Sequence, residues 1–411
     1  FANLAFNSTV PTNYNQWTQT TDADFGMGTK TNTTVSGTGA GASVKLSTTI
    51  AIDSGTGADG SIDLSLGTGN GGCLLTGSDA SGGAGQTRSG ATYNTGTKTC
   101  TINTTTKSTW NFKDVSIPAT YVLTTTQGTG ALIIKATGNV TVNGSINLTG
   151  KGCAGGTGEV FGGAIATSGG GGGSSCGTGG TGAGLMFGSV AGGGGGHGNT
   201  GGNGAGPGSG TIGSGGAGGG TYDSSTQPVL LGSGGAGGEA RVTGYNGGSG
   251  GSGGGAIKII ASGTVTVNGP ITANGNNGEN ITKYTSGGGG SGGSIWIQAS
   301  TITGSVAITA IGGNGGNTTY NSSAILGGGG SGGMIALQYV SSTYSGTPST
   351  AGGAAGVATS YFSYGAAGGA GTVTPTQFTY LSPGTYTSSI KEIGSGTKFG
   401  TISWTETLNG Q

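Results

Sequence analysis

The sequence predicts an all-β fold: parallel β-solenoid rungs of β-helix type, glycine-rich excursions of polyproline II or polyglycine II type, and β-strand segments at both ends. Three observations lead to this prediction. Glycine supplies 105 of 411 residues and charged residues only 6%, where an ordinary globular domain has roughly 25% charged residues. Short strand patterns recur about every 40 residues, which is a signature of repeat architectures. No stretch shows the 3.6-residue apolar period of a helix.

Residues 1–107 form the first predicted region, a set of short β-strands. Apolar and polar residues alternate in segments such as 43–46 and 62–66, and glycine separates these segments. Alternation over a few residues followed by turn residues is the usual pattern of a half-buried strand. We therefore expect an N-terminal β-strand region before the repeats begin.

Residues 108–375 are predicted to form the glycine-rich β-solenoid. Ile257, Ile295 and Ile335 begin three similar strands spaced by 38 and 40 residues, and residues 132–136 resemble an earlier copy. Each unit contains three short strands with Asn-Gly at its corners, where both residue types tolerate positive φ. Stacked units would bury their apolar faces in one column and pair their backbones along the axis.

The longest glycine tract, residues 152–255, is predicted to be an insertion of bundled glycine helices. Polyglycine in the polyproline II conformation leaves its amides and carbonyls free to bond to parallel neighbours. Without Cβ atoms, such segments pack closely. Irregular loops folded over the solenoid are the alternative.

Residues 376–411 are predicted to end the chain in a half-buried strand. Ile402, Trp404 and Leu408 fall on one face, with Ser403, Thr405 and Thr407 on the other. This alternation is typical of a strand with one solvated face.

Four cysteines indicate two disulfide bonds and an oxidising compartment. Cys73, Cys100, Cys153 and Cys176 include no C-x-x-C pair, and His197 is the only histidine, so a zinc site lacks ligands. Pairing Cys73 with Cys100 and Cys153 with Cys176 is favoured, because each bond would close a glycine-rich loop. Free buried thiols in a cytosolic protein are the alternative.

Several classes of function are disfavoured. The net charge is zero and only two arginines are present, so nucleic acid is not an expected partner. No apolar run reaches the length of a membrane span, and a start at Phe1 is expected after removal of a signal peptide. No cofactor, metal site or catalytic residue is predicted. His197 is interpreted as a loop residue, and the Asp53, Asp59 and Asp63 group as a solvated turn rather than a calcium site.

Nine sequons mark candidate N-glycosylation sites, although serine and threonine are frequent enough that chance produces many. Three of them crowd one repeat and its corners, where glycans could coat a face; turn formation is the alternative reading. The nine residues are Asn7, Asn32, Asn103, Asn139, Asn143, Asn147, Asn280, Asn317 and Asn321.

Segments 292–299 (GGSIWIQA), 312–316 (GGNGG) and 400–405 (GTISWT) resemble large glycine-rich, repeat-bearing surface proteins of bacteria and archaea. The resemblance covers the C-terminal two-thirds of the chain and implies β-helices or sandwiches anchored at the cell envelope. The glycine tract is also similar to phage tail-tip adhesins built on packed glycine helices. That family ranks second, because the repeated strand triplets exceed what it needs.

These observations predict an extracellular or cell-surface structural protein whose main partner is itself, as the subunit of a filament, sheath or surface layer. Exposed strand edges near both ends could be completed by strand addition from a neighbour. The expected assembly residues are Phe1, Leu4, Phe6, Val10, Ile402, Trp404 and Leu408. The alternative function is adhesion, in which Tyr284, Tyr320, Tyr361 and Tyr364 stack on glycans or bind a receptor.

Overall fold

The computed structural model describes fourteen segments of the chain, and contacts divide the chain into two compact units. Unit 1 comprises Phe1–Ala51 and Phe378–Gln411, and unit 2 comprises Ile52–Gln377. The three regions expected from the sequence, 1–107, 108–375 and 376–411, stay a prediction. The described residues are 29–31, 33–36, 43–46, 52–59, 61–64, 90–159, 190–206, 215–239, 246–282, 285–318, 324–358, 362–379, 384–387 and 403–406.

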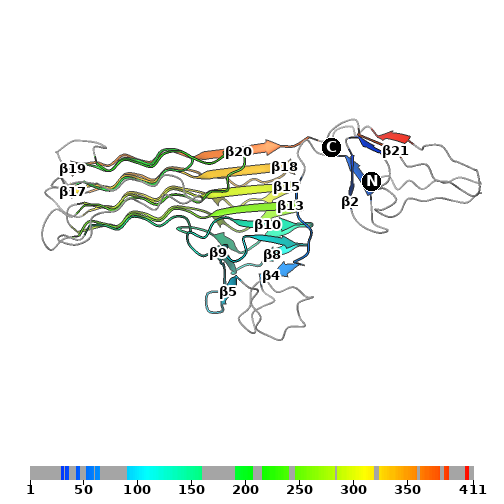
Figure 1. Cartoon of the computed structure of the whole chain (residues 1–411), viewed down its shortest axis with the longest axis horizontal. Coiled ribbons are helices and arrows are strands. Elements are labelled where there is room, and N and C mark those ends of the chain that lie inside the picture. The colour runs from blue at the N-terminus through cyan, green and yellow to red at the C-terminus, as the bar shows by residue number, and fades with distance from the viewer. Residues whose placement is uncertain are drawn as a thin grey trace, which may run out of the picture. The chain divides into compact units, whose positions relative to one another are not determined.

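The regular structure in these described residues is β-strand, apart from a single 3₁₀ position at Leu64 and several turns (Figure 1). Unit 1 contains β1 (Thr29–Thr31), β2 (Thr33–Ser36), β3 (Ser43–Leu46), β21 (Gly384–Thr387) and β22 (Ser403–Glu406). Unit 2 contains β4 (Ile62–Asp63), β5 (Ala91–Asn94), β6 (Thr99–Ile102), β7 (Thr109–Phe112), β8 (Val115–Ile117), β9 (Val122–Thr125), β10 (Leu132–Ala136), β11 (Val140–Val142), β12 (Ser145–Asn147), β13 (Ala256–Val267), β14 (Ile271–Thr272), β15 (Ser294–Gly304), β16 (Ile308–Thr309), β17 (Ala324–Ile325), β18 (Met334–Ser342), β19 (Phe362–Ser363) and β20 (Thr372–Gln377).

The larger sheet of unit 2 has nine strands, in the order β20-β18-β15-β13-β11-β8-β4, with β10 and β7 continuing beside β13. Its pairs are parallel, and the three similar strands lie in register: Ile257 pairs with Ile295, and Ile295 with Ile335. Parallel partners cannot be joined by a tight hairpin, so each pair requires a long connection. Here each of these connections includes a glycine-rich segment, such as residues 287–293 and 327–333.

A second sheet of six strands, β16-β14-β12-β9-β6-β5, shares one apolar core with the first. Alternate residues of its strands are buried, as in β6, where Cys100 and Ile102 are buried between half-buried threonines. Trp110 and Phe112 of β7 contribute the largest side chains to the same core. The short apolar alternations of the sequence therefore form two facing sheets.

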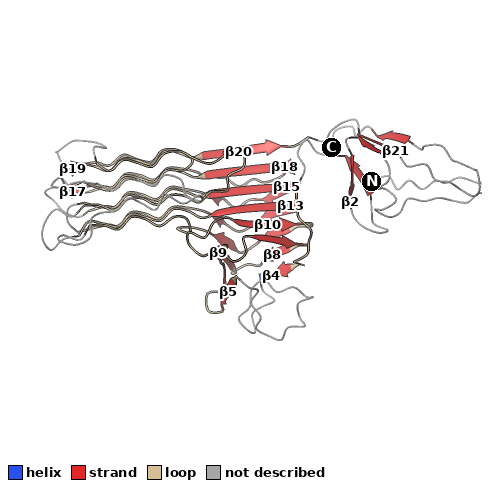
Figure 2. Ribbon diagram, viewed as in Figure 1, coloured by secondary structure: helices blue, strands red, loops and turns tan. Residues whose placement is uncertain are grey.

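The glycine segments run on from the strands and bond to one another (Figure 2). Their bonding repeats every three residues: the amides of Cys153, Gly156 and Glu159 donate to the carbonyls of residues 232, 235 and 238. In a β-strand, by contrast, alternate residues face the same neighbour. We call this array the glycine lattice; its described segments are 152–159, 190–206, 215–220, 232–239, 246–255, 273–280, 286–293, 310–317, 326–333, 350–356 and 364–371.

The lattice requires glycine because backbones approach closely on several sides. A Cβ atom on Gly329 would lie 2.0 Å from the carbonyl oxygen of Gly353, and one on Gly330 would lie 2.1 Å from that of Gly290. Real Cβ atoms do not approach backbone oxygens so closely. Protein interiors are close-packed, so neighbouring backbones cannot easily move aside.

The predicted parallel β-solenoid is wrong. A solenoid stacks similar units along one axis, each contacting only its neighbours, whereas these sheets mix parallel with antiparallel pairs such as β5–β6. The glycine segments are also not excursions from rungs, because residues of the 152–255 tract bond to segments from several repeats. The sequence argument expected backbone bonding within the 152–255 tract, but it assigned the stacking of the repeats to their apolar faces alone.

The described strands of unit 1 form two small antiparallel sheets. Strand β21 pairs with β1 on one side and with β22 on the other, which joins the N-terminal and C-terminal parts of the chain. Strands β2 and β3 form a separate pair. Among the described residues, β1 and β22 are therefore the edge strands of the three-stranded sheet.

Candidate functional site

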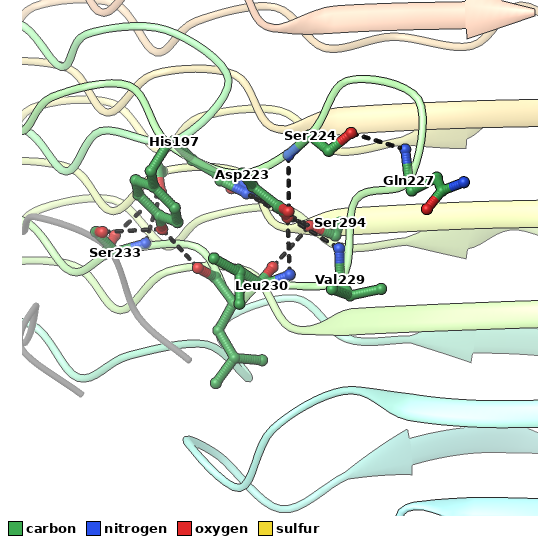
Figure 3. A network of polar contacts seen from close by, with 12 residues as sticks. His197, Asp223, Ser224, Gln227, Val229, Leu230, Ser233 and Ser294 are labelled. Atoms are coloured by element: carbon green, nitrogen blue, oxygen red, sulfur yellow. Dashed lines mark hydrogen bonds and ion pairs between the residues drawn. The ribbon is translucent and has the colours of Figure 1, made fainter. Parts of the chain in front are cut away.

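The only histidine lies in a buried polar cluster inside unit 2, where glycine segments meet the start of β15 (Figure 3). His197 has no exposed surface, and its Nδ1 lies 2.8 Å from the carbonyl oxygen of Gly292. Its Nε2 faces the Asp223 carboxylate at 3.5 Å and the Ser294 hydroxyl at 3.4 Å. The Tyr222 ring packs against the imidazole, with 4.6 Å between ring centroids.

Asp223 organises the loop between Tyr222 and Leu231. Its Oδ2 accepts hydrogen bonds from the amides of Val229 and Leu230, at 2.9 and 2.8 Å. Its other carboxylate oxygen accepts one from the Ser224 amide at 2.8 Å. Burial acts to raise the pKa of Asp223, but the hydrogen bonds from His197 and the backbone outweigh it, so the pKa lies below its ordinary value.

Serine, histidine and aspartate together suggest a hydrolytic triad, but the geometry differs from one. In a triad, the two ring nitrogens separate the roles: one faces the carboxylate and the other faces the nucleophile. Here Asp223 and Ser294 both approach Nε2, while Nδ1 faces a backbone carbonyl. The Ser294 hydroxyl also donates to the Leu230 carbonyl at 2.6 Å. The cluster is therefore arranged to hold the loop rather than to activate Ser294.

The same loop is tied to the outer face of the nine-stranded sheet. Gln338 of β18 donates from Nε2 to the Thr226 carbonyl at 2.8 Å, and its Oε1 accepts from Trp296 Nε1 at 2.9 Å. The Lys258 ammonium lies 3.5 Å from the centroid of the Trp296 ring. Burial, followed by repulsion from Lys135, lowers the pKa of Lys258. These contacts link the loop to three neighbouring strands.

Replacing Asp223 with asparagine is expected to lower the free energy of unfolding by about 1–2 kcal/mol at pH 7, because a neutral amide forms weaker hydrogen bonds than a carboxylate. The folded-state pKa is lowered, so the carboxylate's contribution is present above its unfolded-state pKa and is lost as pH falls through the folded-state value. Urea unfolding at pH 7 and at steps below about pH 4 should show the difference from wild type shrinking.

Asp53→Asn provides the matched control, because the Asp53 carboxylate is 75% exposed beside Lys135. Solvent screens such a pair, so its loss should cost less stability. A difference between Asp223→Asn and wild type that stays constant down to pH 2 would contradict the role assigned to the carboxylate.

Asparagines form rows along one side of the glycine lattice. Asn274, Asn277 and Asn280 each accept, at Oδ1, a hydrogen bond of 2.8 Å from an amide of the next segment, those of residues 311, 314 and 317. In the same way, Oδ1 of Asn314 and of Asn317 accept hydrogen bonds from the amides of Ala354 and Val357. A depression of about 370 Å³ lies on this side, lined by Thr149, Asn274, Gly275, Asn276, Asn277, Ile311, Gly312 and Asn314.

The two described cysteines are both in disulfide bonds. Cys100 belongs to the main core, whereas Cys153 packs in a small cluster with Leu231 and Ala256. Cys73 and Cys176 lie outside the described residues. The pairing of Cys73 with Cys100 and of Cys153 with Cys176 therefore stays a prediction.

Six sequon asparagines are described. Asn139, Asn143, Asn147 and Asn280 are exposed, and Asn103 and Asn317 are half-buried. Asn139 and Asn143 accept hydrogen bonds at Oδ1, from the Thr264 amide and from Asn268 Nδ2, which supports a structural role for them. Glycan attachment uses the other amide atom, so glycosylation stays a prediction. Asn7, Asn32 and Asn321 lie outside the described residues.

The other predicted residues are only partly described. Trp404 lies in β22, whereas Phe1, Leu4, Phe6, Val10, Ile402 and Leu408 lie outside the described residues, as do Tyr284, Tyr320 and Tyr361. Asp53 and Asp59 bond to different lysines, Lys135 and Lys107. In the described part of the chain, no group of three potential ligands could hold a metal ion, and no helix is long and apolar enough to cross a bilayer.

Sequence reasoning missed Asp223, Ser294 and the asparagine rows. Asp223 and Ser294 are 71 residues apart, so no local pattern joins them. The asparagine rows did carry a signal, because Asn274, Asn277 and Asn280 are spaced by three, which matches the hydrogen-bond period of the lattice. Comparisons with protein-family models, curated proteins and solved structures found no match to this chain.

Proposed function

We propose that this chain is a structural subunit of an extracellular filament, sheath or surface layer, and that subunits join by β-strand addition at unit 1. The observation that carries the proposal is the three-stranded sheet of unit 1, whose order β1-β21-β22 leaves two edge strands among the described residues. An edge strand offers unpaired amides and carbonyls to another chain. Strand addition joins chains through backbone bonds and needs no charge.

The construction of unit 2 supports a mechanical role. Its glycine lattice is bonded through the backbone, whereas the ion pairs Lys107–Asp59 and Lys135–Asp53 lie outside the lattice. Backbone hydrogen bonds between buried segments depend little on salt, whereas exposed ion pairs are screened. A body of this kind is suited to conditions outside the cell, where ionic strength varies.

Deleting residues 1–10 is expected to leave folded monomers that no longer assemble. The first described strand begins at Thr29, so the deletion spares every described strand. Negative-stain microscopy should show fibres or sheets for the full chain only, and the two proteins should share one thermal midpoint. A peptide of residues 1–10, added in excess, should also slow assembly of the full chain.

Two outcomes would count against the proposal in different ways. Truncated protein that still polymerises would reject the N-terminal segment as the added strand. Full-length chain that stays monomeric at every concentration would reject the structural role itself.

Adhesion remains a second candidate because of one observation, the asparagine-lined depression of about 370 Å³. Side-chain amides can both donate to and accept from sugar hydroxyls. A glycan array probed with the full chain separates the two functions. Binding that is lost in Asn277→Ala but kept in Asn103→Ala would support adhesion, whereas no binding alongside visible fibres would remove it.

A further inference from the structure

We infer that the last layer of the glycine lattice is a built-in cap, which prevents another layer, from this chain or from a second copy, from continuing the lattice. This layer consists of residues 350–357 and 364–377. The inference does not rest on the proposed function, because it concerns a face of unit 2 and not the strands of unit 1. It does limit where assembly can occur.

Two rows of segments build this side of the lattice. The glycine row contains residues 247–254, 286–293, 327–333 and 365–371, and the asparagine row contains residues 273–280, 310–317 and 350–357. Within each row, the amide of an earlier segment donates to a carbonyl of the next, as Gly289 does to Gly328 and Gly329 to Ala366. Segments of the two rows also bond to each other, as Gly353 does to Gly330.

Two positions of the glycine row are glycine in each of the first three segments, because the following asparagine-row segment lies against them. A Cβ at the first position would meet a carbonyl oxygen at 2.0 Å on Gly251, Gly289 and Gly329. At the second position, a Cβ on Gly254, Gly292 and Gly332 would meet one at 1.9, 2.1 and 1.8 Å. Any side chain here would exclude the next segment.

In the last segment these two positions are Ala367 and Ala370. Gly330 contacts Gly368 and Gly333 contacts Gly371, and this 38-residue offset aligns Gly329 with Ala367 and Gly332 with Ala370. Both alanines are exposed. Their methyl groups therefore occupy the place that the backbone of another asparagine-row segment would need.

Strand β20 closes the sheet beside this layer in a similar way. The Thr372 amide donates to the carbonyl of Gly333 in the neighbouring segment. Because the backbone polar groups of successive strand residues point to opposite sides, those of Pro375 point to the open edge of the sheet. Proline has no amide hydrogen, and it is found in sheets mainly at such edges. Pro375 therefore removes one donor that a further strand would use.

The asparagine row ends at the same layer. Asn277 Oδ1 accepts a hydrogen bond from the Asn314 amide, and Asn314 Oδ1 accepts one from the Ala354 amide. Asn280, Asn317 and Val357 form the same succession. Ala354 and Val357 have no side-chain acceptor, so they cannot bond to another segment in this way. The asparagine side-chain hydrogen bonds therefore end at the layer whose Ala367 and Ala370 methyl groups exclude a further segment.

A cap is needed because the layer still carries the donors that bind further layers. The amides of Gly312 and Gly315 donate to carbonyls of residues 351 and 354 in the last layer. Those of Gly329 and Gly332 donate to carbonyls of residues 366 and 369 in the same layer. The equivalent amides of Gly352, Ala355, Ala367 and Ala370 donate no backbone hydrogen bond within the described part of the chain. Without the methyl groups, this row of donors would be an open edge of the kind that promotes aggregation.

The triple variant Ala367→Gly, Ala370→Gly and Pro375→Thr tests the cap. It opens one face without touching unit 1, and it should shift the mass distribution from that of wild type to dimers, whose share grows with concentration. Mass photometry and sedimentation velocity on the full chain measure this shift. Adding Val373→Glu, a charge in the edge strand β20 at a position 39% exposed, should reverse it.

The inference fails if the triple variant is folded and its mass distribution matches that of wild type. It also fails if Val373→Glu in the wild-type background reduces self-association, since wild type would then already pair through this face. Assembly through unit 1 is scored separately, by deletion of residues 1–10 in the wild-type background. The cap and the strand-addition proposal can therefore fail independently.

Discussion

Replacing Gly330 with alanine is expected to lower the free energy of unfolding of unit 2 by about 3 kcal/mol or more, at or above the upper end of overpacking costs. The added Cβ would lie 2.1 Å from the carbonyl oxygen of Gly290. The Gly330 amide also donates to Gly313 and its carbonyl accepts from Gly353, both at 2.8 Å. The added methyl group would meet backbone atoms, which cannot rotate aside as a flexible side chain can. The neighbouring glycine segments would therefore have to move apart at this position.

Thermal and urea unfolding of Gly330→Ala against Gly96→Ala measure this effect. Gly96 is exposed in a turn, and the nearest atom to an added Cβ is Asn94 Oδ1 at 3.4 Å. The control should therefore stay within about 0.5 kcal/mol of wild type. Equal losses in the two variants would mean that close backbone approach is not what makes glycine necessary in the lattice.

Replacing Phe112 with alanine is expected to cost about 3–5 kcal/mol, the usual range for removing a buried aromatic side chain. Phe112 is 1% exposed and stacks on Trp110, with 6.0 Å between ring centroids. Both rings lie in the one core shared by the two sheets. The cavity would therefore weaken contacts between the sheets and the stacked ring together.

Urea unfolding followed by tryptophan fluorescence reports this loss, because Trp110 lies beside the cavity. Val373→Ala is the control, since Val373 of β20 is 39% exposed and its truncation should have little effect. If Phe112→Ala unfolded at the same urea concentration as wild type, the aromatic pair could not be the centre of the core.

The repeats could be predicted from the sequence, and so could the register of their strands. Ile257, Ile295 and Ile335 stand at equivalent places in similar segments, and the structure pairs them directly. Side-chain alternation also identified strands such as β3 and β11. Periodicity is local, so it survives in the sequence wherever one face of a strand is buried.

The buried polar cluster could not be predicted in the same way. His197 was noticed only because it is the sole histidine, whereas Ser294 lies 97 residues away and Asp223 lies 26 residues away. Their meeting depends on which glycine segments lie side by side. A glycine tract has no side-chain pattern that specifies its neighbours, so the partners of His197 become visible only in the fold.

By itself, the sequence determined the strand repeats, the glycine-rich connections between them and the alternation of the buried faces. Tertiary structure alone decided that the sheets are mixed rather than a solenoid, which glycine segments bond to one another, and that the lattice ends at Ala367 and Ala370. The physical reason is that side-chain patterns record which face is buried, whereas backbone hydrogen bonds between glycines leave no such record. The neighbours of a glycine segment can be identified only from the positions at which a methyl group would fit or would collide with another backbone.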